Sequence, residues 1–213
     1  MKEHKRLITV TAFICIIPAL IGILLWNRLP DQIPIHWNLE GTPDNYASRL
    51  TAVLGIPALI TALHLAGAFV ILHDPKIGSV PAKILRLGLW ICPLVSLFAA
   101  LLTYSTAFGM PVDVGMVATI FVGLLLISIG IIMPECPQNY TIGIKLPWTL
   151  ADEENWKATH KLAGPLWIAS GFVMILLSLL RLLSSGILFL LIIVILIVPS
   201  VYSWKLYRKT HQK

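Results

Sequence analysis

Residues 114–133 read VGMVATIFVGLLLISIGIIM, a run without a single charged side chain. An α-helix rises about 1.5 Å per residue, so this run is long enough to cross a hydrocarbon core about 30 Å thick. Five other uncharged segments have a similar length. We expect each to form a membrane-spanning helix: Leu7–Trp26, Leu50–Leu72, Leu87–Phe108, Gly164–Leu180 and Gly186–Trp204.

The composition supports this interpretation. Of the 213 residues, 57% are hydrophobic and only 12% are charged, and the mean hydropathy is +0.86. Soluble domains carry about 25% charged residues, so a soluble globular enzyme is excluded. In lipid, only helices and closed barrels satisfy their backbone hydrogen bonds, and long apolar runs without alternation exclude the barrel. The sequence therefore predicts an all-α integral membrane protein built as a bundle of six transmembrane helices.

The positions of the basic residues predict the orientation in the membrane. Three of the sixteen, Arg28, Arg49 and Arg181, lie on one side of the predicted spans. The other thirteen lie on the opposite side: Lys2, Lys5, Arg6, Lys76, Lys83, Arg86, Lys145, Lys157, Lys161, Lys205, Arg208, Lys209 and Lys213. By the positive-inside rule both termini are cytoplasmic. The net charge of +6 is then a topology signal, and direct binding to nucleic acid is not expected.

Two connections between spans are long enough to carry specific recognition. The first, residues 27–49, reads NRLPDQIPIHWNLEGTPDNYASR and is called the outer loop here. Pro30 and Pro34 favour an extended path, and the Glu40-Gly41 pair favours a turn. Two interpretations of its His36, Trp37 and Tyr46 side chains stay open: anchors at the membrane interface, or a small folded cap that a ligand touches.

The second long connection, residues 134–163, is called the inner loop and reads PECPQNYTIGIKLPWTLADEENWKATHKLA. Thr149, with Asp152 three residues later, resembles a capping box. This predicts a short amphipathic helix at the interface, over about 150–162, which Gly164-Pro165 ends. Trp156 and His160 lie one turn apart on it, and Glu153 is spaced to pair with Lys157. The alternative is an elbow helix that only anchors the chain.

Recognisable catalytic chemistry is absent from the sequence. It contains no glycine-rich phosphate loop, no G-x-S-x-G, no H-E-x-x-H and no C-x-x-C, so neither an enzyme, nor a cofactor, nor a metal site is expected. His64 is the one ionisable side chain deep in a predicted span. It motivates an alternative function as a small-molecule or ion transporter, although a neutral histidine bonded to a neighbouring helix is equally compatible.

The two loops also resemble a known family. The inner loop carries N-x-x-x-G-x-K-x-P-W-T-L from Asn139 to Leu150 and then W-x-x-T-H-K from Trp156 to Lys161. This pattern resembles the signature of the SdpI family, bacterial membrane proteins typified by the immunity protein for the sporulation-delaying peptide toxin. Lys145 stands where the family more often has arginine. The outer loop, with LPxxIPxHWN, resembles the domain of unknown function that often precedes the signature.

The resemblance implies a multi-pass protein of the bacterial cytoplasmic membrane with two regions. Residues 1–108 form an N-terminal membrane region with three spans and the outer loop, and residues 109–213 form an SdpI-like region with three spans and the inner loop. Its expected role is resistance to a secreted antimicrobial peptide toxin. In the typifying system, the membrane protein also captures a cytoplasmic ArsR-type winged-helix repressor. The oligomeric state stays open.

Candidate site residues follow from these two loops. We expect the toxin to contact the outer loop at His36, Trp37, Asn38 and Tyr46. We expect the regulator to contact the inner loop at Asn139, Gly143, Lys145, Pro147, Trp148, Thr149, Trp156, Thr159, His160 and Lys161. Membrane lipids are the remaining expected partners.

Overall fold

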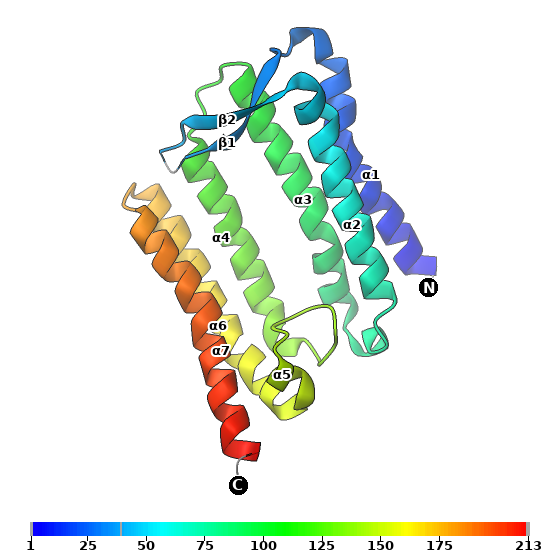
Figure 1. Cartoon of the computed structure of the whole chain (residues 1–213), viewed down its shortest axis with the longest axis vertical. Helices are drawn as coiled ribbons and strands as arrows, with labels where there is room; N and C mark the ends of the chain where they lie inside the picture. The colour runs from blue at the N-terminus through cyan, green and yellow to red at the C-terminus, as the bar shows by residue number, and fades with distance from the viewer. Residues whose placement is uncertain (1, 39, 212–213) are drawn as a thin grey trace. The chain divides into compact units, whose positions relative to one another are not determined.

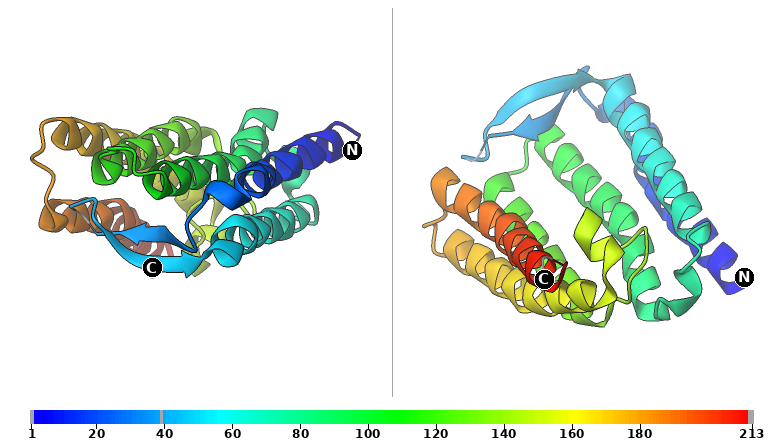
Figure 2. Two further views of the ribbon diagram at one scale, coloured as in Figure 1. Left: turned by 90° about the horizontal axis from the view of Figure 1, so that it is seen from above. Right: turned by 60° about the horizontal axis from the view of Figure 1, so that its bottom comes forward.

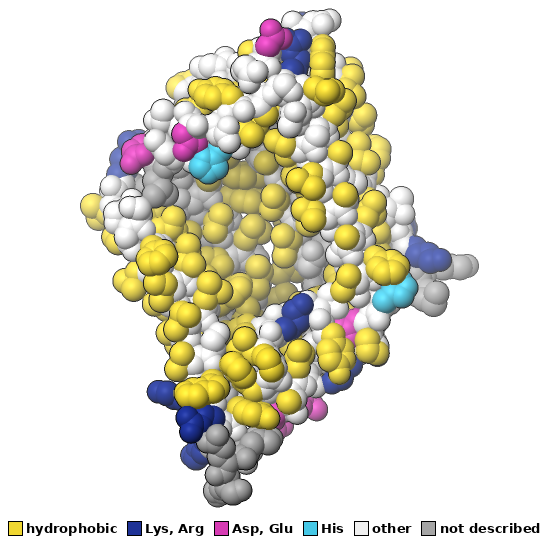
Figure 3. Space-filling model, viewed as in Figure 1, with side chains coloured by type: hydrophobic (Ala, Val, Ile, Leu, Met, Phe, Trp, Pro, Cys, Tyr) yellow, Lys and Arg dark blue, Asp and Glu magenta, His cyan; other side chains and the backbone are white. Residues whose placement is uncertain are grey.

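The computed structural model describes residues 2–38 and 40–211. Among these residues, six helices are long and apolar enough to cross a membrane: Lys5–Leu24, Thr51–Leu72, Ala82–Ala107, Val114–Glu135, Glu153–Leu179 and Ser185–Thr210. Hydrophobic side chains cover much of the visible face along these helices (Figure 3). The predicted six-span, mostly helical architecture is confirmed, and the protein is a multi-pass membrane protein.

The chain divides into two compact units. The first comprises Met1–Val70 and Arg86–Val117, and the second comprises Ile71–Leu85 and Ala118–Lys213. The first unit contains α1 (Lys2–Leu24), η1 (Trp26–Arg28), β1 (Gln32–Trp37), β2 (Pro43–Ser48), the π-helical turn η2 (Thr51–Gly55), and most of α2 (Ile56–Leu72) and α3 (Ala82–Ala107).

Polar side chains join the helices of the first unit. Ser96 Oγ on α3 donates to the carbonyl oxygen of Cys15 on α1 at 2.9 Å. Further along the same two helices, the Tyr104 hydroxyl donates to the carbonyl oxygen of Pro18 at 2.8 Å. Such bonds hold helices together in lipid, where apolar burial gives no driving force between them.

The outer loop forms a β-hairpin, an element that the sequence analysis did not predict. β1 and β2 pair antiparallel, with Ile33 opposite Ala47 and Pro34 opposite Tyr46. The extended path expected around Pro34 is therefore present, and it forms the strand β1, which pairs with β2 across the turn. Gly41, in that turn, has φ +76°, a conformation that other residues rarely adopt.

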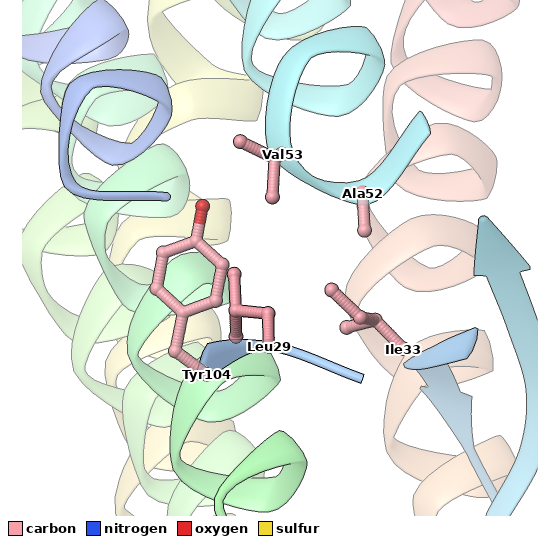
Figure 4. Close-up of a cluster of buried hydrophobic side chains, with 5 residues drawn as sticks. All are labelled: Leu29, Ile33, Ala52, Val53 and Tyr104. Carbon is pink, nitrogen blue, oxygen red and sulfur yellow. The ribbon is translucent and has the colours of Figure 1, made fainter. Parts of the chain in front are cut away.

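The inner face of the hairpin packs on the helix ends of the same unit. Ile33 from β1 lies in one buried cluster with Leu29, Ala52, Val53 and Tyr104 (Figure 4). The cluster therefore fixes the hairpin against the turn η2 and the end of α3.

The second unit contains η3 (Ile77–Ser79), most of α4 (Val114–Ile132), η4 (Met133–Glu135), α5 (Pro147–Ala151), α6 (Glu153–Leu179) and α7 (Ser185–His211). The helices α6 and α7 run side by side in all views (Figures 1 and 2). Few residues of α7 are buried, which is consistent with a helix that faces lipid.

Glycine pairs bring α4 and α6 into backbone contact. A Cβ added at Gly164 would lie 2.8 Å from the carbonyl oxygen of Gly130, and one added at Gly171 would lie 2.5 Å from that of Gly123. The spacing is seven residues on both helices, so the two pairs lie on one seam of an antiparallel contact. Small residues at such a seam let helix backbones approach closely in membranes.

The separate helix predicted over 150–162 is wrong. The helix that begins at Glu153 continues to Leu179, with Pro165 in its interior. An interior proline costs about 3 kcal/mol in an isolated helix. Here Gly164, next to Pro165, packs against Gly130 and the side chain of Pro134, so tertiary packing holds the helix through the proline. The short helix in the inner loop is instead α5, Pro147–Ala151.

Candidate functional site

The outer hairpin exposes three of the four residues expected to contact a toxin. His36 Nδ1 pairs with Asp44 Oδ1 across the hairpin, and both side chains are exposed to solvent. Tyr46, on β2, is 51% exposed. Asn38 is also exposed, and its Oδ1 accepts the backbone N–H of Thr42 at 2.9 Å, which shapes the turn.

Trp37 lies differently from the other outer candidates. Its side chain is half-buried, and among the described residues its buried indole Nε1 has no hydrogen-bond partner. A buried N–H without a partner is unfavourable. Trp37 is therefore partly covered next to the turn, and the exposed surface of the hairpin is formed by His36, Asn38, Asp44 and Tyr46.

In the inner loop, Asn139 organises a tight turn. It is fully buried, and its Oδ1 accepts the backbone N–H groups of Thr141 and Ile142 at 2.9 and 2.6 Å. Its Nδ2 donates to the carbonyl oxygens of Pro137 and Ile142, each at 2.9 Å. All the bonding capacity of this amide is therefore used inside the loop.

The turn ends against a stacked pair of rings on α6. The rings of Trp156 and His160 lie 4.1 Å apart with 21° between their planes, and both residues are fully buried. The indole N–H of Trp156 donates to the carbonyl oxygen of Cys136 at 2.8 Å. The expected placement of the two rings on one helix face is confirmed, and it serves packing inside the protein.

His160 is held in one neutral form by its two partners. Nδ1 lies 2.8 Å from the carbonyl oxygen of Trp156, so this nitrogen donates. Nε2 accepts the backbone N–H of Ile144 at 3.0 Å, so it carries no proton. These roles require the neutral tautomer with its hydrogen on Nδ1.

Thr149 is buried inside α5, and the prediction that it caps the following helix is wrong. Its Oγ1 accepts the N–H of Leu146 at 2.8 Å and lies 2.9 Å from the carbonyl oxygen of Ile144. The cap of α6 is Asp152, whose Oδ1 accepts the N–H groups of Glu154 and Asn155 at 2.9 and 3.1 Å. A hydroxyl already bonded within the loop is not free to cap the next helix.

The expected ion pair at the start of α6 is confirmed. Lys157 Nζ lies 3.0 Å from the carboxylate of Glu153 and 3.3 Å from that of Glu154.

A buried polar network between α6 and α7 includes Thr159, which the sequence analysis singled out, and two residues that it missed. Asn155 Nδ2 donates to the carbonyl oxygen of Ser203 at 2.8 Å. Asn155 Oδ1 accepts the Ser203 hydroxyl and lies 3.2 Å from Thr159 Oγ1. Asn155 and Ser203 belong to no recognised motif, and only their polarity within apolar surroundings could have signalled them.

The connection between α2 and α3 also contacts the inner loop, which the sequence analysis did not anticipate. Asp74 is 6% exposed, and its Oδ2 accepts the N–H of Tyr140 at 2.8 Å and the hydroxyl of Thr141 at 2.7 Å. Its Oδ1 accepts the N–H of Lys76 at 2.8 Å. Burial acts to raise the pKa of Asp74, but these hydrogen bonds to the carboxylate lower it below its ordinary value of 3.8.

Five of the expected inner-loop residues reach or approach the surface. Lys145, Pro147 and Lys161 are exposed, and Trp148 is half-buried with its indole N–H unpaired among the described residues. The backbone of Gly143 is open on one side, while its φ of +121° brings the other side against the ring of His160. The candidate set thus divides into two parts. We call the buried residues the buried frame (Asn139, Thr149, Trp156, Thr159 and His160) and the others the exposed rim (Gly143, Lys145, Pro147, Trp148 and Lys161).

His64, the candidate within the spans, has a partner in the neighbouring helix. It is 3% exposed, and its Nε2 lies 2.9 Å from Thr11 Oγ1 on α1. The Thr11 hydroxyl is also 2.8 Å from the carbonyl oxygen of Leu7, to which it donates, so His64 Nε2 is the donor to Thr11. This arrangement joins α1 to α2.

Comparison with known proteins identifies two family regions in the chain. Residues 135–203 match the SdpI/YfhL protein family, and residues 13–61 match DUF1648, a domain of unknown function. The chain is similar to Immunity protein SdpI of Bacillus subtilis (strain 168), with 26% identity over 199 residues, 89% of this chain and 90% of that protein. No solved structure matches the chain. The resemblance to the SdpI family is confirmed.

Proposed function

We propose that this chain, which carries an SdpI/YfhL family region behind a DUF1648 region, is a membrane immunity protein that protects its cell against a secreted antimicrobial peptide toxin. The observation that carries the proposal is the similarity, along nearly the whole chain, to an immunity protein. The six spans support it, because a multi-pass protein is placed where a membrane-directed peptide acts.

The toxin meets the outer hairpin on its exposed face. Tyr46 supplies an aromatic ring, and the His36–Asp44 pair supplies a polar group beside it. Aromatic residues held on a rigid scaffold are effective contact residues in interfaces. The hairpin is such a scaffold because Ile33 and the cluster beneath it hold one face in place.

Survival of a toxin-sensitive bacterium tests this proposal. Cells that express the protein should survive purified sporulation-delaying peptide at a concentration that kills control cells. Tyr46→Ala and His36→Ala should raise sensitivity about tenfold, the effect of losing about 1.4 kcal/mol of binding. Gln32→Ala, at an exposed position of β1 in the same hairpin, is the matched control. Absence of protection by the unmodified protein would contradict the immunity function.

A cytoplasmic regulator docks on the exposed rim of the inner loop in the same proposal. Lys145 and Lys161 are exposed cations next to the buried frame, Lys145 following Ile144 and Lys161 following His160. The buried motif residues then shape this surface without touching the partner. Transport is not proposed, because His64, which motivated it, is bonded to Thr11.

Recruitment of an ArsR-type repressor from the typifying system to membranes tests the docking surface. The double variant Lys145→Glu/Lys161→Glu should lower the amount of repressor that sediments with membranes in the presence of toxin. Lys157→Glu, on the same helix, is the control, because Lys157 is already paired with Glu153 and Glu154. Equal recruitment by the double variant and the unmodified protein would remove the rim from the proposal.

A further inference from the structure

The connection between α2 and α3 belongs to the second unit, although both helices lie mostly in the first. The chain leaves the first unit after Val70 and returns to it at Arg86. This segment, 71–85, lies outside both regions that match known families. Its contacts join it to residues inside the SdpI/YfhL match.

Three side-chain links hold the connection to the inner loop. Lys83 pairs with Glu135, Lys76 Nζ donates to Gln138 Oε1, and Asp74 accepts from Tyr140 and Thr141. Positions 83, 76 and 74 thus meet positions 135, 138 and 140–141 in reverse order, as two antiparallel segments do. We call this set of links the clasp.

The clasp continues directly into the buried frame. Thr141, which donates its hydroxyl to Asp74, also donates its backbone N–H to Asn139 Oδ1. Gln138, which accepts from Lys76, donates through Nε2 to the carbonyl oxygens of Thr149 and Leu150 at 2.9 and 3.0 Å. A displacement of the connection therefore acts on the Asn139 turn and on α5 together.

At its other end, α2 begins close to the outer hairpin. β2 ends at Ser48, and the π-helical turn Thr51–Gly55 leads straight into α2, which ends at Leu72, two residues before Asp74. A π-helical turn is a rare element that is frequently found at functional sites. The hairpin and the clasp are thus joined by a single helix.

We propose that the clasp is the element through which the outer hairpin acts on the inner-loop surface, with Asp74 as the positioning residue that holds it closed. This coupling rests on the proposed function, because it assumes that toxin binding at the outer hairpin changes the exposed rim of the inner loop. The holding role of Asp74 stands apart from that function. A ligand shifts the clasp only if it binds the open and closed forms with different affinity.

The reactivity of the Cys136 thiol can be used to measure whether the clasp is closed. Its side chain is 5% exposed, and Sγ lies 3.5 Å from Asn139 Nδ2. Burial raises the pKa of this thiol to about 11, against a smaller lowering effect of the Asn139 bond. Because the thiolate is the reactive form, Cys136 should react slowly with a maleimide while the turn is closed.

The experiment measures maleimide labelling of Cys136 in nanodiscs, in a Cys15→Ala/Cys92→Ala background. Asp74→Ala should speed labelling about tenfold or more because the thiol becomes exposed and ionises more easily. Thr141→Val removes one bond to Asp74 with little change of shape and should speed labelling less, in the same direction. Glu154→Ala, an exposed carboxylate on α6, is the matched control and should label at the original rate. Original rates in both Asp74→Ala and Thr141→Val would overturn the holding role.

Addition of sporulation-delaying peptide tests the coupling. The peptide should change the labelling rate of the background protein, and Asp74→Ala should show no such change. A background protein that protects cells but labels at one rate with and without peptide would overturn the coupling. Failure of the unmodified protein to protect cells would instead overturn the proposed function, while the effect of Asp74→Ala on labelling would still decide the holding role.

Discussion

A Cβ atom placed on Gly143 would lie 2.5 Å from Nε2 of His160, so the backbone of the inner loop packs directly on the ring it bonds. The same ring nitrogen accepts the N–H of Ile144 at 3.0 Å. Glycine and histidine, seventeen residues apart in the sequence, therefore form one contact. This contact joins the two halves of the inner-loop signature in this chain: one half supplies the turn and the other the rings.

The first prediction concerns Gly143. Gly143→Ala should lower the free energy of unfolding by about 1–3 kcal/mol, because φ of +121° is unfavourable for alanine. The clash with His160 and Trp156 adds to this loss. Denaturant titration in detergent, followed by tryptophan fluorescence, measures it. Gly67→Ala, at a helical glycine with nothing within 4 Å of the added methyl, is the control and should be neutral or stabilising. Equal behaviour of the two variants would contradict the packing described.

The second prediction concerns the seam between α4 and α6. Gly130→Val should destabilise the protein by about 1–3 kcal/mol, because the added atoms meet the carbonyl oxygen of Gly164 and the side chain of Ile168. Gly171→Val should have a similar effect at the second glycine pair. Thermal unfolding in detergent is the measurement, and Gly67→Val is a control of equal size. A seam that tolerates valine at both positions is incompatible with backbone contact between these helices.

The third prediction is the pH dependence that Asp74 contributes. Its pKa is lower in the folded protein than its ordinary value of 3.8, so its stabilisation is complete above about pH 4. It is lost as the pH falls below 3.8 through the folded-state pKa. Asp74→Asn should therefore be less stable than the unmodified protein by about 1.5–3 kcal/mol at pH 7, the range for hydrogen bonds to a charged group.

The difference between Asp74→Asn and the unmodified protein should shrink toward pH 2–3, in unfolding titrations at matched pH. The control is Asp31→Asn, which breaks an ion pair with Arg49 at a carboxylate that is 93% exposed. Such pairs contribute about 0–1 kcal/mol. A constant difference across the whole pH range would show that the charge of Asp74 is not the stabilising feature.

The fourth prediction is an energetic coupling between Asn155 and Ser203. Asn155→Ala should cost about 1–3 kcal/mol, because it removes both bonds to Ser203 and leaves the Ser203 hydroxyl without its partner in a buried site. Once Asn155 is absent, Ser203→Ala should cost less than it does in the unmodified protein. A double-mutant cycle should give about 0.5–2 kcal/mol of coupling. Ser200→Ala, at a half-buried serine of α7 whose hydroxyl bonds the carbonyl oxygen of Leu196 on its own helix, serves as the comparison. Additive effects of the two changes would mean that the network is not energetically connected.

Particular elements show what could be predicted from the sequence and what could not. The spans were predictable because the run at 114–133 and its five counterparts are each long and apolar enough by themselves. The break expected at Gly164-Pro165 was not correct, because local propensity favours it while packing of Gly164 on α4 opposes it. The hairpin was missed because Pro34 and the short length of both strands weaken the alternation that marks a strand.

For the candidate site, too, one part could be predicted from the sequence and another could not. The residue types of the inner loop were singled out from the sequence, but their burial was not visible there. Asn139, Thr149 and His160 each bond to backbone groups of the loop itself. Which backbone groups they reach depends on the folded path of the chain. Asp74 was not singled out because its partners lie 66 and 67 residues away.

The sequence by itself determined that this chain crosses a membrane six times, since crossing requires only about 20 consecutive apolar residues and no partner. It also singled out the two long loops that carry the family-like motifs. Only the tertiary structure decided which loop residues form a buried frame and which form an exposed rim. It alone joined the α2–α3 connection to the inner loop. The physical reason is that a hydrogen bond or a backbone contact depends on two residues meeting, and distance along the chain does not specify which residues meet.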